Sequence, residues 1–258
     1  MKYTCFVKND TLSVLHYQNL VASLNANGWQ YDQINPQLII TIGGDGTVLA
    51  AIHQYQHLLD RVAFVGLHTG HLGFFNDYRL EEAKDFINDL VSRQPVFEPK
   101  QLLQAVIDGD QRQKVFALNE IRIESSIKTQ TLTIRIDGRE FEVLRGSGIC
   151  VSGQVGSTAY NRSIGGAVMD DEIIGLQLSE VNSINNSIFR SLSSPLVLNR
   201  NRNVTVEAED FTYSMLSYDH LYYSLQGRRQ VDIRLSDKAV FFARYRELAY
   251  LSRLRVLF

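Results

Sequence analysis

Residues 38–55 read LIITIGGDGTVLAAIHQY, an apolar run that ends in a glycine-rich turn with a single carboxylate, Asp45. The segment 38–42 is apolar and β-branched, which is typical of a strand buried on both faces of a sheet, and 48–55 is predicted to be a helix. Asp45 is therefore expected at the strand-to-helix corner. The glycines of this loop allow positive φ and close approach to a ligand, and N–H groups near a helix N-terminus suit phosphate oxygens.

The GGDG loop is neither of the two best-known nucleotide loops. Its spacing differs from G-x-G-x-x-G and from G-x-x-x-x-G-K-[ST], and no lysine follows it. Because a carboxylate would repel phosphates, Asp45 is expected either to hold Mg²⁺ or to accept a proton from a hydroxyl that attacks phosphorus. The alternative is a tight turn in which Asp45 caps the following helix.

Composition bounds the class of protein. The chain has 258 residues, 45% of them hydrophobic, which suits one large or two ordinary globular domains. A net charge of −2 without a basic block gives no support for nucleic-acid binding. Cys5 and Cys150 lie in apolar surroundings, and no signal peptide or membrane-length apolar run is visible, so we expect reduced thiols and a cytoplasmic protein. A C-terminal arginine cluster is expected to form a solvated or subunit-facing edge: Arg244, Arg246, Arg253 and Arg255.

The pattern of strand-like and helix-like segments changes near residue 98. Strand-like and helix-like segments alternate before it, which predicts a Rossmann-like α/β domain over 1–98. Short alternating runs follow, which predict a β-rich, sandwich-like domain over 99–238, and the apolar segment 239–258 is expected to pack back on the N-terminal domain. The predicted strands are 3–7, 38–42, 62–66, 102–108, 115–123, 131–136, 141–144, 203–207 and 231–235, and the predicted helices are 11–27, 48–55 and 81–93.

A second glycine-rich loop, HTGHLGFF at residues 68–75, follows the apolar run 62–67. Ligands bind at the carboxyl ends of strands in open α/β sheets, so this loop is a further candidate for ligand binding. His68 and His71 lack neighbouring Cys, Asp or Glu, which favours loop hydrogen bonding over metal ligation. Phe74 either stacks on a base or fills core.

Two polar segments interrupt the β-rich half. Asn119 and Glu120 lie within the apolar run 116–123, where an amide can bond an adenine and a carboxylate can bond ribose hydroxyls. The alternative for this pair is an exposed strand end. The stretch 145–167, RGSGICVSGQVGSTAYNRSIGGA, is rich in small and hydroxyl residues. It predicts a backbone close to a ligand, and the alternative is a glycine-rich connector.

Together these motifs resemble the NAD kinase family, most of all its compact form from Gram-positive bacteria. The matching segments, in the family's order, are GGDGT at 43–47, HTGHLGF at 68–74, NE at 119–120, GSTAYNRSIGGA at 156–167 and SPLV at 194–197. The resemblance implies ATP-dependent phosphorylation of NAD at the 2′-hydroxyl of its adenosine ribose, giving NADP. It also implies a divalent cation, Mg²⁺, between the donor phosphates, and a homo-oligomer, either a tetramer or a dimer.

The resemblance also implies roles for individual residues. Asp45 would be the base on the 2′-hydroxyl, Asn119 and Glu120 would meet the adenosine, and Asp219 would line the groove, either in the same chain or from a neighbouring subunit. The implied phosphate-donor loop is Gly43, Gly44, Gly46 and Thr47. The implied NAD site is Asp45, Gly46, Phe74, Asn119, Glu120, Arg145, Ser147, Val155, Thr158, Ala159, Tyr160, Asn161, Arg162, Ser163, Asn182 and Asp219.

Two departures from the family pattern fall in the implied NAD site. Ser147-Gly148 replaces an Asp-Gly pair, and Ser-Gly-Gln-Val-Gly at 152–156 replaces Ser-Thr-Pro-Thr-Gly. Loss of a carboxylate acceptor and of a rigid proline is expected to weaken or reshape dinucleotide binding. Two hypotheses follow, an active NAD kinase and a catalytically weak or regulatory nucleotide-binding paralogue. The sequence also leaves open ATP against polyphosphate as donor, and NAD against NADH as acceptor.

Overall fold

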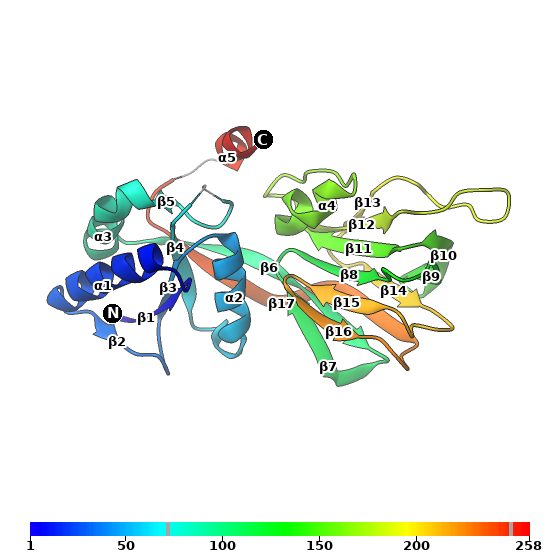
Figure 1. Ribbon diagram of the computed structural model, residues 1–258, viewed down its shortest axis with the longest axis horizontal. Coiled ribbons are helices and arrows are strands. Elements are labelled where there is room, and N and C mark those ends of the chain that lie inside the picture. The colour runs from blue at the N-terminus through cyan, green and yellow to red at the C-terminus, as the bar shows by residue number, and fades with distance from the viewer. Residues whose placement is uncertain (71–72, 248–249) are drawn as a thin grey trace. The chain divides into compact units, whose positions relative to one another are not determined.

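The computed structural model describes residues 1–70, 73–247 and 250–258, apart from the side chain of Gln111. They form two compact units, which we call unit 1 (Met1–Lys100 with Lys238–Phe258) and unit 2 (Gln101–Asp237). Strands β6 (Val96–Ile107) and β17 (Gln230–Arg244) each begin in one unit and end in the other (Figure 1). None of the described helices has the length and apolar character needed to cross a membrane.

Unit 1 is a parallel sheet with helices on both faces. Its central strand β3 (Leu38–Ile42) is buried throughout and pairs in parallel with β1 and β4. Leu38, Ile40 and Ile42 pack in one cluster with α1 and α3, whereas Ile39 is buried outside that cluster, on the α2 face. The other elements are β1 (Lys2–Val7), α1 (Thr11–Ala26), β2 (Gln30–Tyr31), α2 (Asp45–Gln54), β4 (Ala63–His68), β5 (Tyr78–Arg79), α3 (Ala83–Ser92) and α5 (Tyr250–Leu257).

The GGDG corner differs from its prediction in one respect. Helix α2 begins at Asp45, not at residue 48, so Asp45 is the first helical residue. Among the glycines of the loop, Gly43 has a positive φ of +154°, whereas Gly44 is the extended N-cap and Gly46 lies within the helix. A Cβ on Gly43 would lie 2.2 Å from the hydroxyl oxygen of Thr47, so the turn closes only around a glycine.

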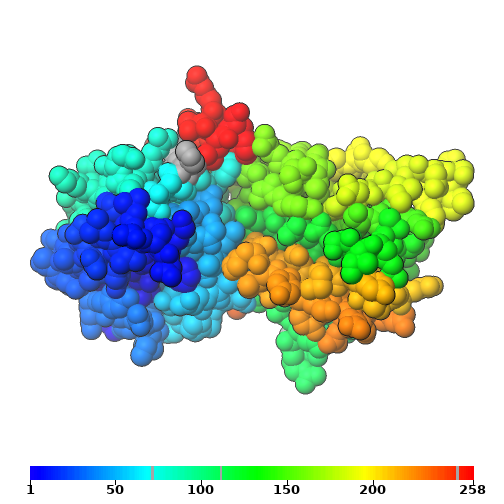
Figure 2. Space-filling view, in the orientation of Figure 1, coloured from blue at the N-terminus to red at the C-terminus, as the bar shows by residue number. Residues whose placement is uncertain are grey.

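Unit 2 is a β-sandwich, and the predicted class of an α/β region followed by a β-rich region is confirmed. One sheet has the order β13-β12-β11-β8-β15-β16, and apolar residues of both sheets, such as Ile121 and Ile134, share one core. The tip of the β6–β7 hairpin projects from this unit (green in Figure 2). The remaining strands are β7 (Asp110–Ala117), β8 (Glu120–Glu124), β9 (Gln130–Ile136), β10 (Arg139–Gly146), β11 (Gly148–Gly153), β12 (Gly175–Val181), β13 (Leu196–Asn199), β14 (Asn203–Glu207), β15 (Met215–Tyr218) and β16 (Leu221–Ser224), and the short helix α4 is Tyr160–Ser163.

The prediction of one strand over 115–123 is wrong. Strand β7 ends at Ala117, β8 begins at Glu120, and the two strands belong to different sheets. The backbone N–H groups of Leu118 and Asn119 donate to the Asp219 carboxylate, at 2.9 and 2.8 Å, and this replaces ladder bonds at the crossing. The apolar run looks continuous in sequence because Leu118 is itself fully buried.

The expectation that the C-terminal arginines form a solvated edge is wrong for three of the four. Arg244 and Arg253 pair with Asp77, and Arg246 pairs with Glu82. Arg255 is exposed. The three paired arginines meet carboxylates far away in the sequence, and such pairs cannot be read from local composition.

Candidate functional site

The carboxylate of Asp45 is held by the loop that follows β4. Its Oδ2 accepts the N–H of Phe74 at 2.7 Å, and its Oδ1 accepts the N–H of Phe75 at 3.2 Å and the side-chain amide of Asn76 at 3.4 Å. No side-chain bond caps helix α2, so the capping alternative for Asp45 is wrong. The carboxylate instead connects the carboxyl ends of two neighbouring parallel strands, β3 and β4.

The close fit around Asp45 requires Gly73. A Cβ on Gly73 would lie 2.2 Å from both carboxylate oxygens. His68, at the end of β4, accepts the N–H of Gly70 on its Nδ1 at 2.9 Å, so a neutral imidazole carries its proton on Nε2. That Nε2 faces the GGDG loop, 3.4 Å from where a Cβ of Gly44 would lie. His68 therefore forms a hydrogen bond within the loop that follows β4. His71 lies outside the described residues.

The N-terminus of α2 presents backbone N–H groups next to this carboxylate. Those of Asp45 and Gly46 have no acceptor within the helix, since the first turn is closed by Thr47 and Val48 donating to the Gly44 carbonyl. Gly46 is exposed, and a Cβ there would meet nothing within 4 Å. The corner can therefore bind an anion from the N–H side and offer a base from the carboxylate side.

A second group of polar residues lies along β8 in unit 2. Because side chains alternate along a strand, Glu120, Arg122 and Glu124 share one face. Arg122 donates to Glu124 at 3.0 Å, lies 3.9 Å from Glu120, and stacks over the ring of Tyr160 at 4.1 Å. Tyr160 donates to Glu124 at 2.5 Å. Arg122 and Glu124 are not among the site residues predicted from sequence, although the alternation E-x-R-x-E at 120–124 indicates a polar strand face.

Glu120 is the most perturbed carboxyl of this group. Burial, with the nearby Asp219 carboxylate adding to it, raises the pKa of Glu120 to about 7, while Arg122 opposes the shift. Its Oε2 is buried and has no hydrogen-bond partner among the described residues. A buried, unpaired carboxyl oxygen of this kind is a candidate for binding a hydroxyl group.

The segment after β11 packs tightly against Asn119, which lies between β7 and β8. A Cβ on Gly156 would lie 1.9 Å from the carbonyl oxygen of Asn119, which also accepts the N–H of Gly153 at 3.1 Å. Asn161 is fully buried, and its amide bonds to the Ser179 hydroxyl and to the carbonyls of Ser157 and Ala167. The part of the stretch after β11 is therefore a tightly packed turn with short helices, and its close approach to a ligand stays a prediction.

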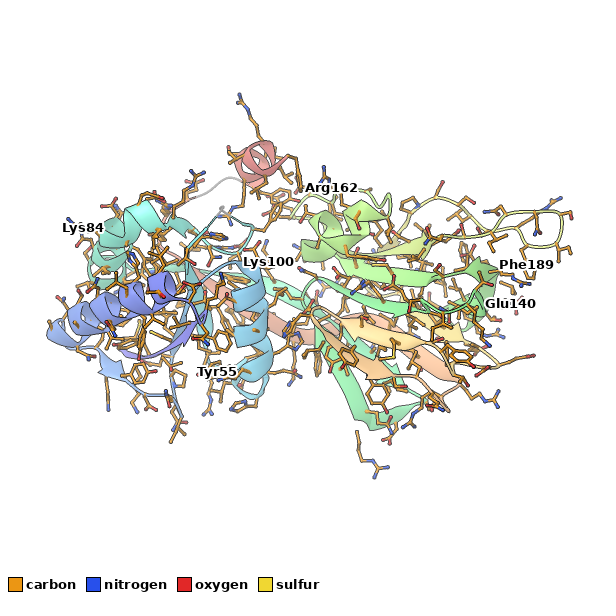
Figure 3. The ribbon with its side chains drawn as sticks, in the orientation of Figure 1. Tyr55, Lys84, Lys100, Glu140, Arg162 and Phe189 are labelled. Atoms are coloured by element: carbon orange, nitrogen blue, oxygen red, sulfur yellow. The ribbon has the colours of Figure 1, made fainter. Side chains whose placement is uncertain are left out.

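The other residues of the implied NAD site lie at the edges of unit 2. The hydroxyl of Ser147 accepts from the exposed Asn182 at 3.4 Å, and Arg145 stacks over Phe189 at 5.1 Å. Arg162 on α4 is exposed (Figure 3). The remaining residues of the implied site follow β11, in the turns over 155–163. Of these, Val155, Thr158 and Ala159 are half-exposed, and Ser163 is exposed. Asp219 differs from the rest, since both of its carboxylate oxygens bind backbone N–H groups.

Two family models together cover most of the chain. The ATP-NAD kinase N-terminal domain matches residues 30–94, and the ATP-NAD kinase C-terminal domain matches residues 103–250. The chain belongs to the NAD kinase family. The resemblance inferred from its motifs is thereby confirmed.

Members of the family match the chain over nearly its whole length. NAD kinase 1 of Listeria innocua is 37% identical over 256 residues, which cover 98% of this chain and 97% of the relative. The NAD kinase of Lactobacillus gasseri is 36% identical over 253 residues, covering 97% and 94%.

Solved structures of NAD and NADH kinases share the fold. An NAD kinase from Archaeoglobus fulgidus in complex with ATP has a TM-score of 0.80 at 21% identity, covering 99% of both chains. Yeast NADH kinase complexed with NADH has a TM-score of 0.80 at 17% identity, covering 99% of this chain and 86% of the other. At these identities the likeness shows the NAD kinase fold alone.

We predict that Gly156→Ala destabilises this NAD kinase family member. The new methyl would overlap the Asn119 backbone, which cannot move aside as a flexible side chain can, and overpacking of this kind costs about 1–3 kcal/mol. Gly153→Ala is the matched control, because its Cβ would meet only Leu103 Cγ, at 3.8 Å. Urea unfolding of the two variants measures the difference, and equal free energies of unfolding would contradict the packing argument.

We also predict a pH-dependent stability contribution from Glu120. Its pKa is raised from 4.5 to about 7 in the folded protein, so the folded state binds more protons than the unfolded state between these values. Stability from this group is therefore complete below pH ~4.5 and falls as the pH rises to about 7. The free energy of unfolding of wild type minus that of Glu120→Gln should decrease over this window. A difference independent of pH would refute the raised pKa.

Proposed function

We propose that this chain is an NAD kinase, which transfers the terminal phosphoryl group of ATP to the 2′-hydroxyl of the adenosine ribose of NAD and so yields NADP. Membership of the family supports the reaction. The observation in this chain that carries it is the Asp45 carboxylate, fixed by the Phe74 and Phe75 N–H groups, beside the first N–H groups of α2, which have no acceptor within the helix. Phosphoryl transfer requires mainly positioning and electrostatic stabilisation, which this corner offers.

Asp45 is proposed as the general base. A carboxylate has about four lone-pair sites, and three donors already approach its oxygens, so capacity remains for one substrate hydroxyl. In the proposed step the ribose 2′-oxygen forms a bond to the γ-phosphorus, and the bond from that phosphorus to the β,γ-bridging oxygen breaks. The hydroxyl proton passes to Asp45, and ADP leaves. Gly43, Gly44, Gly46 and Thr47 are proposed to line the donor phosphates.

Mg²⁺ is proposed as the divalent cation of the reaction. Within the described residues no group of three or more His, Cys, Asp or Glu side chains could hold a metal ion. Asp45 is a single carboxylate already engaged by N–H donors, so this donor set fits a cation held chiefly by the phosphates of ATP. When bound, the cation would supply neutralisation of triphosphate charge that no lysine of the loop provides.

NAD-binding residues are proposed in each unit by itself. In unit 1 they are Asp45, Gly46 and Phe74. Unit 2 would supply Asn119 for the adenine and the unpaired Oε2 of Glu120 for a ribose hydroxyl. Asp219 would act through the backbone of Leu118 and Asn119, which it holds. The remaining proposed NAD contacts are Arg145, Ser147, Val155, Thr158, Ala159, Tyr160, Asn161, Arg162, Ser163 and Asn182.

A homo-oligomer, dimer or tetramer, is proposed on the basis of exposed apolar residues in unit 2. Ile188 is 80% exposed, and Val197 lies on the edge strand β13 with 51% exposed. Phe189 and Glu140 lie at the same end of unit 2 (Figure 3). Light scattering of the purified protein would give its mass in solution. A cytoplasmic location is proposed because both cysteines are unpaired.

The direct test is an assay of the purified protein with ATP, Mg²⁺ and NAD, with NADP formation as readout. We expect NADP to accumulate, and we expect excess EDTA to abolish turnover, because the donor loop has no cation of its own. Parallel reactions with polyphosphate and with NADH decide the donor and the acceptor. Tight NAD binding without NADP formation would favour the regulatory alternative.

We predict that Asp45→Asn lowers kcat by about 10²–10⁴-fold, the usual contribution of a positioned general base. The asparagine keeps the size of the side chain, but its NH₂ group cannot accept a hydrogen bond, so the bond from either the Phe74 or the Phe75 N–H group is also lost. Asp60→Asn, an exposed carboxylate of the same unit, is the control. An Asp45→Asn variant that retained more than about a tenth of wild-type kcat would rule out the base assignment.

We predict that Ser147→Asp tightens NAD binding by about 10- to 150-fold, since a charge-assisted hydrogen bond to the carboxamide contributes roughly 1.5–3 kcal/mol. Ser147 is half-buried, and its hydroxyl accepts from the amide of the exposed Asn182, from which an aspartate could also accept. ADP, which lacks the nicotinamide end, should bind both proteins equally in calorimetric titration. Unchanged NAD affinity would remove Ser147 from the site.

A further inference from the structure

The C-terminal end of the chain returns to the loop that holds Asp45. Arg244, near the end of β17, and Arg253, on α5 (red in Figure 1), converge on one oxygen of the Asp77 carboxylate, each at 2.7 Å. Asp77 is 1% exposed and the Arg253 side chain is 7% exposed. A buried charge cluster of this kind is costly unless its geometry is well satisfied. The cluster lies next to residues 74–76, which donate hydrogen bonds to the Asp45 carboxylate.

The two arginines also bind the carbonyl groups of the Asp45-binding loop. Arg253 donates to the carbonyl of Phe74, and Arg244 donates to the carbonyl of Phe75 at 3.0 Å. The Phe74 carbonyl and the Phe75 N–H belong to the same rigid peptide group. That peptide group is therefore held from both sides, by Arg253 at its oxygen and by Asp45 at its nitrogen, at 3.2 Å.

We propose that Arg253 and Arg244 are positioning residues for Asp45, acting through the peptide groups of Phe74 and Phe75. A rotation of the peptide between Phe74 and Phe75 would break its bond to Arg253 and its bond to Asp45 together. A guanidinium bound to the carbonyl also polarises the peptide, which strengthens the N–H bond to the carboxylate on its other side. The orientation of the carboxylate thus depends on a helix at the other end of the chain.

A third arginine and two further carboxylates extend the same support. Arg246 donates to the carbonyl of Asp77 and pairs with both carboxylate oxygens of Glu82, at 2.7 and 2.9 Å. Arg244 pairs with Glu98 at 2.7 Å. Arginine suits these places because its planar fork can bind a carbonyl and a carboxylate at once, whereas a lysine ammonium is a point charge.

The test compares Arg253→Met with Arg255→Met, because Arg255 is an exposed arginine on the same helix. Misplacement of a catalytic group by about 1 Å can cost ~10²-fold in rate, so we expect Arg253→Met to lower kcat about 10- to 100-fold with little change in KM for ATP or NAD. Arg255→Met should match wild type. Arg253→Lys, which keeps the charge but loses the fork, should recover only part of the rate.

A double-mutant comparison separates positioning from general damage. If Arg253 acts through Asp45, then adding Arg253→Met to Asp45→Asn should lower the residual turnover no further. A similar loss of rate in both backgrounds would overturn the proposal, as would wild-type kcat in Arg253→Met itself.

The kinetic measurements rest on the proposed NAD kinase activity. We therefore add a second measurement that does not depend on this activity. Amide hydrogen exchange at Phe75 should be faster in Arg253→Met than in wild type and unchanged in Arg255→Met, with or without nucleotide. If wild type made no NADP, the proposed function would fail while this exchange result still tested the contact. Unchanged Phe75 exchange in Arg253→Met would overturn the positioning role in either case.

Discussion

The hydrogen bonds from the Phe74 and Phe75 backbone to the Asp45 carboxylate are the interaction on which the rest of unit 1 depends. A negative group beside N–H groups suited to phosphate is electrostatically unfavourable for an anionic substrate unless it is fixed in one direction. The loop after β4 fixes it, and the N-terminal end of α2 stabilises its charge through the helix dipole. The fit leaves no space for a side chain at Gly73. One carboxylate thereby ties together the carboxyl ends of two parallel strands.

In unit 2 an aspartate carboxylate likewise binds two backbone N–H groups, at the point where the chain passes from one sheet to the other. The chain crosses between the two sheets at Leu118 and Asn119, where ladder hydrogen bonds end. Asp219 accepts both orphaned N–H groups, and Gly156 lets the following turn pack on the Asn119 backbone. Glu120, the first residue after this crossing, is consequently buried in a place where its carboxyl has a raised pKa and one oxygen without a partner. Fixing the backbone here determines where the polar face of β8 begins.

In both units, then, side chains distant in sequence hold the backbone of the segments proposed to bind substrate. Asp219 binds the N–H groups of 118–119, and the C-terminal arginines bind the carbonyls of Phe74, Phe75 and Asp77. Buried charges of this type add little net stability compared with apolar packing, but they restrict the backbone to one arrangement. For phosphoryl transfer, in which the protein contributes mainly geometry, such restriction is of direct use. It also means that residues outside the sequence motifs can affect the rate.

The sequence by itself determined the α/β and β-sandwich classes, the strand-to-helix corner at Asp45 and the family, because burial periodicity, glycine turns and motif order are local properties of the chain. It did not determine that 115–123 divides between two sheets, that α2 begins at Asp45, or that Arg244 and Arg253 are internal. The residue roles in the NAD site remain proposals. Only the tertiary structure decided the hydrogen-bond partners of Asp45 and Asp77 and the position of Asp219 beside Glu120, because the free energy of a buried charge is set by groups that are close in space, here far apart in sequence.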